Sequence, residues 1–126
     1  MKKILLIALA LAACLITLVA AVLFFETRAE RAGVAFTLEN AGSKPLRTVV
    51  VKVTGRSYEL GEMAPGTIKM TTLHPAGESH IELEFSPGRR LIIDCYIEPG
   101  YSGSIRAKVT SQAVVAVDDK TKVAPY

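Results

Sequence analysis

The sequence predicts an all-β domain, an immunoglobulin-like antiparallel β-sandwich of seven to eight strands, preceded by one N-terminal transmembrane helix. Three observations lead to this prediction. An uncharged apolar run opens the chain, and from Val34 onward apolar residues alternate with polar ones. Proline, glycine and asparagine interrupt the alternation roughly every 8 to 12 residues, a spacing typical of sandwiches.

The opening run, from Ile4 to Phe25, contains no charged residue. As a helix it is about 33 Å long, enough to cross the hydrocarbon of a bilayer. A cleaved secretory signal has an apolar region of only about 7 to 15 residues. We therefore expect an uncleaved signal-anchor helix at 4–25, with 1–3 as a cytoplasmic N-terminus and 26–33 as a juxtamembrane linker.

The charges beside this helix predict its orientation. Lys2 and Lys3 lie on the short N-terminal side, and Lys and Arg are enriched on the cytoplasmic side of membrane helices. We therefore expect a single-pass protein of the inner membrane with its C-terminal domain in the periplasm.

Two alternatives for the N-terminal segment stay open. Leu11-Ala12-Ala13-Cys14 resembles the lipobox of bacterial lipoproteins, in which the cysteine is lipidated and becomes the new N-terminus. A lipoprotein normally continues with a polar linker, whereas this chain stays apolar through Phe25. The other alternative is signal cleavage near Ala21, which would release a secreted domain.

The predicted domain extends from 34 to 118 and is followed by a flexible tail at 119–126. Its first strand shows the pattern clearly, because Val34, Phe36 and Leu38 share one face. The predicted strands are 34–39, 47–54, 58–60, 67–73, 79–85 and 90–97, with one long or two short strands in 103–117.

Residues that favour turns separate these strands. Glycine and asparagine accept a positive φ, and proline presets φ for the first position of a turn. The predicted turns are Asn40–Ser43, Thr54–Ser57, Met63–Gly66, His74–Gly77, Pro87-Gly88 and Pro99-Gly100.

Charge and cysteine content exclude several kinds of site. The chain has 15 Lys and Arg against 12 Asp and Glu, and Lys2 and Lys3 supply two of the positive charges. The remainder is nearly neutral with mixed signs, so we expect no nucleic-acid partner. Cys14 lies in the apolar run and Cys95 on the inward face of a strand, so we expect no disulfide and an inert thiol at Cys95.

Part of the domain resembles a known family. The resemblance covers about 34–85 and rests on Leu38-Glu39-Asn40-Ala41-Gly42, Pro45-Leu46, Val49, Val51, Val53, Leu60-Gly61 and Pro65-Gly66. This pattern is similar to the bacterial immunoglobulin-like repeats of the CARDB type and to uncharacterised proteobacterial single-pass membrane proteins with the same layout. The resemblance implies a scaffold or binding module and brings no catalytic residues or cofactor with it.

These observations predict a non-enzymatic, membrane-anchored interaction module. Its partner is expected to be another envelope protein, bound through a sheet edge or a loop end. No small-molecule substrate is evident. Ala8, Ala10, Ala12 and Ala13 leave open an assembly through the membrane helix itself.

Copper binding in the periplasm is the alternative function. Met63, Met70, His74 and His80 are soft or borderline ligands close together in the sequence. Against this, Met70 is expected to pack in the core beside Ile68, and His80 alternates outward.

An enzyme is a further alternative, since Ser102, His74, His80, Asp94 and Glu98 include groups used for nucleophilic or acid-base catalysis. On one strand, however, Asp94 and Glu98 would lie about 13 Å apart, too far to act on one bond.

Overall fold

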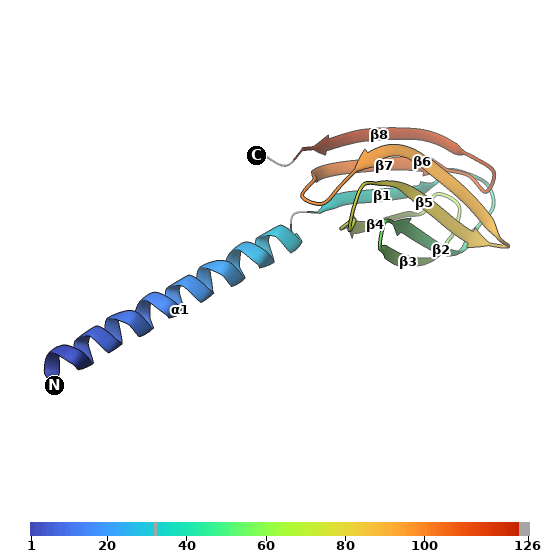
Figure 1. The fold of residues 1–126 in the computed structure, drawn as a ribbon. Helices are drawn as coiled ribbons and strands as arrows, with labels where there is room; N and C mark the ends of the chain where they lie inside the picture. The colour runs from blue at the N-terminus through green and yellow to red at the C-terminus, as the bar shows by residue number, and fades with distance from the viewer. Residues whose placement is uncertain (32, 124–126) are drawn as a thin grey trace. The chain divides into compact units, whose positions relative to one another are not determined.

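The computed structural model describes residues 1–31 and 33–123, with side chains described for 1–24 and 33–123. The chain divides into two compact units, Met1–Arg31 and Ala32–Tyr126. The first is a single helix and the second carries all eight strands (Figure 1).

Helix α1 spans Lys2–Arg31. Its segment Lys2–Phe24, 23 residues, is long and apolar enough to cross a membrane, and none of it is buried within the protein. The hydroxyl of Thr17 donates a hydrogen bond of 2.9 Å to the carbonyl of Ala13, so this polar group is satisfied within the helix. The helix also continues beyond the predicted end at Phe25, and most of the expected 26–33 linker is therefore helical.

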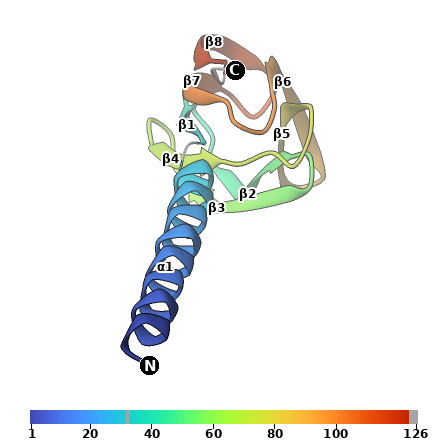
Figure 2. The same cartoon turned by 60° about the vertical axis from the view of Figure 1, so that its left-hand side comes forward.

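The second unit is a sandwich of two four-stranded sheets. Its strands are β1 (Val34–Asn40), β2 (Leu46–Val53), β3 (Arg56–Met63), β4 (Ile68–Leu73), β5 (Ser79–Ser86), β6 (Arg89–Ile97), β7 (Ser102–Val109) and β8 (Val114–Lys122). Sheet I has the order β4-β1-β7-β8 and sheet II the order β3-β2-β5-β6. Figure 2 shows the two layers facing each other.

The predicted fold class, an all-β sandwich behind one apolar helix, is confirmed. Strand order is the detail that the pattern did not predict. In constant-type immunoglobulin domains the first strand pairs with the second, whereas here β1 lies between β4 and β7, and its pairing with β7 is parallel. The chain therefore changes sheet between β1 and β2, which places the first two strands in opposite layers.

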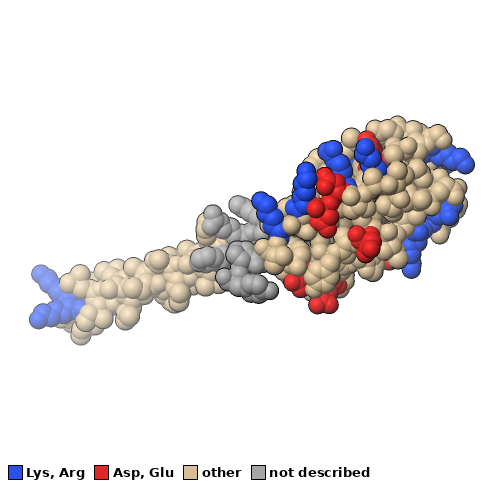
Figure 3. Space-filling view, turned by 90° about the horizontal axis from the view of Figure 1, so that it is seen from above, with Lys and Arg blue, Asp and Glu red and all other residues tan. Residues whose placement is uncertain are grey.

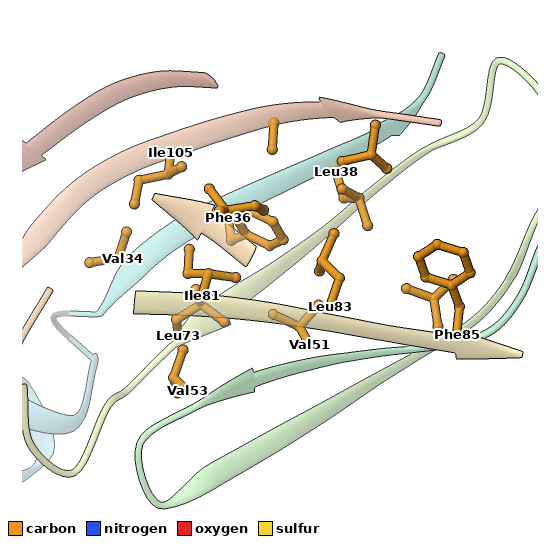
Figure 4. Close-up of a cluster of buried hydrophobic side chains, with 14 of the residues drawn as sticks. Val34, Phe36, Leu38, Val51, Val53, Leu73, Ile81, Leu83, Phe85 and Ile105 are labelled. Carbon is orange, nitrogen blue, oxygen red and sulfur yellow. The ribbon is translucent and has the colours of Figure 1, made fainter. Parts of the chain in front are cut away.

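The core lies between the sheets and consists of the alternating apolar residues (Figure 4). The alternation predicted for the first strand is confirmed, because Val34, Phe36 and Leu38 of β1 are buried in this core. The alternation of β5 is confirmed too, because Ile81, Leu83 and Phe85 enter the core from the opposite sheet. The completely or almost completely buried apolar side chains also include Leu46, Val49, Val51, Val53, Met63, Leu73, Ile93, Ile97, Ile105, Ala107 and Val109.

The predicted C-terminal tail is wrong in part. The sequence predicts one long or two short strands in 103–117, and the structure has two, β7 and β8. Strand β8 continues to Lys122 and pairs with β7 from Val109↔Val114 to Ser102↔Lys122, so 119–122 belong to the domain. Backbone pairing orders this segment while most of its side chains stay exposed, and a pattern based on buried side chains cannot detect it. Residues 124–126 lie outside the described part of the chain.

Asn40 joins the loops at one end of the sandwich. Its side chain is completely buried. The Nδ2 group donates to the carbonyls of Lys44 (2.8 Å) and Met63 (3.0 Å), and Oδ1 accepts from the N–H of Gly42 (3.1 Å). Its backbone exchanges two further hydrogen bonds, of 3.0 and 2.8 Å, with the turn at 64–67. The asparagine therefore does more than form the turn expected from sequence, because it ties this turn to the end of β3.

Replacement of this asparagine should destabilise the sandwich. Asn40→Asp keeps a side-chain oxygen that accepts from the N–H of Gly42. It removes the Nδ2 group, however, so the carbonyls of Lys44 and Met63 lose their hydrogen-bond donor. We expect a loss of about 2–4 kcal/mol in the free energy of unfolding. Urea titration of the full chain in maltoside micelles, followed by near-ultraviolet circular dichroism, measures it. The exposed loop variant Ser43→Ala is the control, and equal stability of N40D and wild type would contradict this role.

Candidate functional site

The four residues considered for copper do not converge on one site. Met63, predicted to lie in a turn, is the last residue of β3 and is completely buried. Met70 was expected in the core beside Ile68, but both are exposed on the outer face of β4, Met70 by 69 %. The two methionines thus lie on opposite sides of a sheet layer, one inside the core and one in solvent.

The two histidines are also on different elements. His74 follows β4 in sheet I, and its backbone N–H donates to the hydroxyl of Tyr58 at 2.8 Å. His80 is exposed on β5 in sheet II. Within the described residues no group of three His, Cys, Asp or Glu side chains is arranged to hold a metal ion. These placements do not support the copper alternative.

The residues considered for catalysis are likewise scattered. Ser102 begins β7, Asp94 is exposed on β6, and Glu98 follows β6. Glu98 accepts a hydrogen bond of 3.2 Å from the hydroxyl of Tyr96. In the part of the chain that the structure describes, no hydrogen bond or ion pair joins a serine, a histidine and a carboxylate into a catalytic set.

Tyr96 is the centre of a small polar and aromatic cluster. Hydrogen bonds to the carboxylates of Glu78 and Glu98, together with burial, raise the pKa of its hydroxyl above the usual range. The ring of Tyr101 lies edge-on to it, with centroids 6.1 Å apart. The Tyr96 ring is nevertheless 49 % exposed, so the cluster presents aromatic surface to solvent.

Cys95 has the inert character expected from the sequence. It is half-buried and packs against the core on the same face of β6 as Ile93 and Ile97. Burial raises the pKa of the thiol to about 11, with a smaller contribution from the negative charges of Asp119 and Asp94. The reactive thiolate is therefore scarce at neutral pH.

The outer face of sheet II carries a network of ion pairs. Lys52 contacts Glu84 at 2.7 Å, and Arg90 contacts Glu82 at 2.8 Å and Glu84 at 3.4 Å. The hydrogen bond from the Lys52 ammonium is the main reason that the pKa of Glu84 is lowered. These charges compensate one another across strands β2, β5 and β6, as paired surface charges of a folded sheet do.

Opposite charges are also interspersed on the face seen in Figure 3. Blue and red side chains alternate there, with broad uncharged areas between them. This arrangement agrees with the nearly neutral composition of the domain and differs from the continuous basic surface of nucleic-acid-binding proteins.

Three of the four edge strands carry features that oppose the addition of another strand. Lys69 lies on the inward face of β4 and donates to the carbonyl of Leu60 on β3, so one lysine protects both neighbouring edges. On β8, Asp119 lies opposite the buried Ile105 and accepts hydrogen bonds from the N–H (2.9 Å) and the hydroxyl (2.7 Å) of Thr121. Inward-facing charges of this kind are a common protection of sheet edges.

The remaining edge strand, β6, has its one inward-facing charge at its first residue, Arg89, which lies opposite the buried Phe85. From Leu91 onward its inward positions are apolar or a thiol: Leu91, Ile93, Cys95 and Ile97. Its outward positions include Ile92, which is 57 % exposed, and Tyr96. The alternation of this strand leaves these two residues at outward positions, and an apolar and an aromatic side chain at such positions are the signal that could have identified them as surface candidates.

Comparisons with known proteins identify no relative. No family model, curated protein or solved structure matches this chain. The assignment of a function therefore rests on the surfaces described above.

Replacement of the inward-facing Lys69 should allow the edge strands β3 and β4 to pair with another copy of the chain. An incoming strand would bury the Lys69 ammonium without an anionic partner, at a cost of about 1–3 kcal/mol. In Lys69→Leu this cost is absent, so we expect self-association at least about tenfold tighter, measured by sedimentation in density-matched micelles.

Lys108→Leu is the matched control for this prediction. It makes the same change of net charge on the exposed face of β7, where Lys108 contacts Glu39 at 3.6 Å. If Lys69→Leu and Lys108→Leu self-associate equally tightly, net charge and not the inward position of Lys69 prevents strand pairing at this edge.

Proposed function

We propose that this chain is a single-pass membrane protein that presents its β-sandwich outside the cytoplasm as a non-enzymatic protein-interaction module. The observation that carries this proposal is helix α1. Its 23-residue apolar segment has no side chain buried against the rest of the protein, so lipid is the environment that can cover it. Lys2 and Lys3 at its N-terminal end support an orientation with that end in the cytoplasm.

The length of the apolar segment favours a retained anchor over the two other fates. Cys14 and Ala21 both lie within the 23-residue span Lys2–Phe24. Lipidation at Cys14 would follow removal of the preceding residues and leave a short apolar stub, and cleavage near Ala21 would discard the span.

Strand β6 is the surface that best suits a protein partner. An edge strand can pair with an extended segment of another chain, and main-chain hydrogen bonds then provide affinity. The one inward-facing charge of β6, Arg89, lies at the start of the strand, so the stretch from Leu91 to Ile97 has none, and Ile92 and Tyr96 flank it with apolar and aromatic surface. Tyrosine and large apolar residues are enriched at the centres of protein interfaces.

The anchor has a direct test in cells. We expect the full chain to stay in the membrane fraction after alkaline carbonate treatment and a C-terminal alkaline phosphatase fusion to be active. The double variant Leu11→Lys/Leu15→Lys should lose membrane retention, because each charge at the helix centre costs about 2.5–3.5 kcal/mol of insertion free energy.

Cys14→Ser is the control for lipidation. A retained anchor predicts unchanged mass, processing and membrane association in this variant. Incorporation of fatty acid that depends on Cys14, or release of the wild-type chain by carbonate, would contradict the anchor.

The interaction surface is tested by a photo-crosslinking residue at position 92. We expect a discrete crosslinked product in intact cells, and we expect it to disappear when the same strand carries Tyr96→Lys. The matched control is position 115 on β8, because Val115 is 59 % exposed and Ile92 is 57 % exposed. Absence of a product at 92, or identical products at 92 and 115, would count against β6 as the binding edge.

A further inference from the structure

The loops at the end of the sandwich where β1 finishes are basic and contain no carboxylate. This Asn40 end consists of the segments 41–45, 64–67, 87–88 and 110–113, none of which includes Asp or Glu. Lys44 lies in the first of them, and Arg89 begins β6 immediately after the third. On the face seen in Figure 3, the blue side chains at this end of the domain have no red ones beside them, whereas blue and red are mixed toward its other end.

The cations of this end are exposed and not neutralised. Lys44 and Arg89 make no ion pair with any described residue, and the Arg89 guanidinium donates only one long hydrogen bond, of 3.3 Å, to Gln112 Oε1. Arg47 is also exposed and makes no ion pair with a described residue, and it lies directly opposite Ser86 in the ladder between β2 and β5. Elsewhere on the domain Lys52, Arg90, Lys108 and Lys120 pair with carboxylates, whereas Arg56, Arg106 and Lys122 do not pair with any described residue.

A groove brings these groups to one place. It has a volume of about 480 Å³ and is lined by Lys44, Ser86, Gly88, Arg89 and Ser111, with the proline rings and Phe85 completing its walls. The two basic residues thus come from different segments, the β1–β2 loop and the start of β6, and two serines are also among the lining residues. No carboxylate lines the groove.

We infer that this groove binds an oxyanion of the phosphate class, either a free phosphate ester or the headgroup of an anionic phospholipid. A guanidinium presents planar paired donors that match two phosphate oxygens, and an ammonium and hydroxyls complete such sites. A concave site lined by one sign of charge also concentrates counter-ions from solution. The volume leaves room for a phosphate together with the group to which it is esterified.

The backbone contributes to this site through its rigidity. The β1–β2 loop that carries Lys44 is held by the buried Asn40 side chain, which bonds the Lys44 carbonyl itself. Arg89 is fixed at its backbone by pairing with Phe85 across the β5–β6 hairpin. The backbone that carries the two cations therefore needs little ordering when a ligand binds, and only their side chains lose freedom. This inference concerns the sandwich alone and holds or fails independently of the membrane anchor.

The experiment is a titration of the ¹⁵N-labelled full chain in maltoside micelles with sodium phosphate at constant ionic strength. We expect saturable shifts of the Gly88, Arg89 and Ser111 amide signals. Arg89→Gln should raise the apparent dissociation constant at least about tenfold, because a charge-assisted hydrogen bond to the ligand is lost. Arg56→Gln, an exposed arginine at the opposite end of β3, is the control and should leave the dissociation constant unchanged.

The same spectra distinguish the two sources of phosphate. Saturation by soluble glycerol phosphate indicates a free ester, whereas shifts that occur only in nanodiscs containing phosphatidylglycerol indicate a lipid headgroup; both results support the site. Shifts that never saturate, an equal loss in Arg56→Gln and Arg89→Gln, or no response to any of these ligands would overturn it.

Discussion

The removal of apolar surface from water is the constraint on which both parts of this chain depend, and each part meets it differently. The sandwich covers its alternating apolar residues internally, with side chains such as Phe36 and Leu83 completely buried between the sheets. Helix α1 has apolar residues on every side and no second layer, so none of its span is covered by protein. That difference is the basis of the proposal that the chain is a membrane-anchored module.

The buried polar group at the Asn40 end connects this packing to function. A loop end without regular structure leaves backbone groups unpaired, and burial of such groups is costly. Asn40 satisfies several of them at once by bonding Lys44, Gly42 and Met63. The same bonds hold Lys44 beside the groove, so a residue required by the fold also determines where a functional cation lies.

The sequence was sufficient to predict the fold class, because alternation and turn residues report directly on local structure. It could not predict strand order, since the parallel pairing of β1 with β7 joins residues far apart in the chain and leaves no local pattern. It also misplaced residues at edges: Met70 looks like a core residue but faces solvent, and 119–122 look like a tail but form a strand. The basic groove was missed for a similar reason, since Lys44 and Arg89 are separated in sequence and only the fold brings their loops together.

The most direct test of this account is the behaviour of a chain shortened to begin at Gly33, compared with the full chain in buffer without detergent. Because the sandwich buries its own core, we predict a soluble monomer with a β-type far-ultraviolet circular dichroism spectrum and well-dispersed amide signals, while the full chain requires lipid or detergent. A shortened chain that is helical, unfolded or insoluble without α1 would contradict the account.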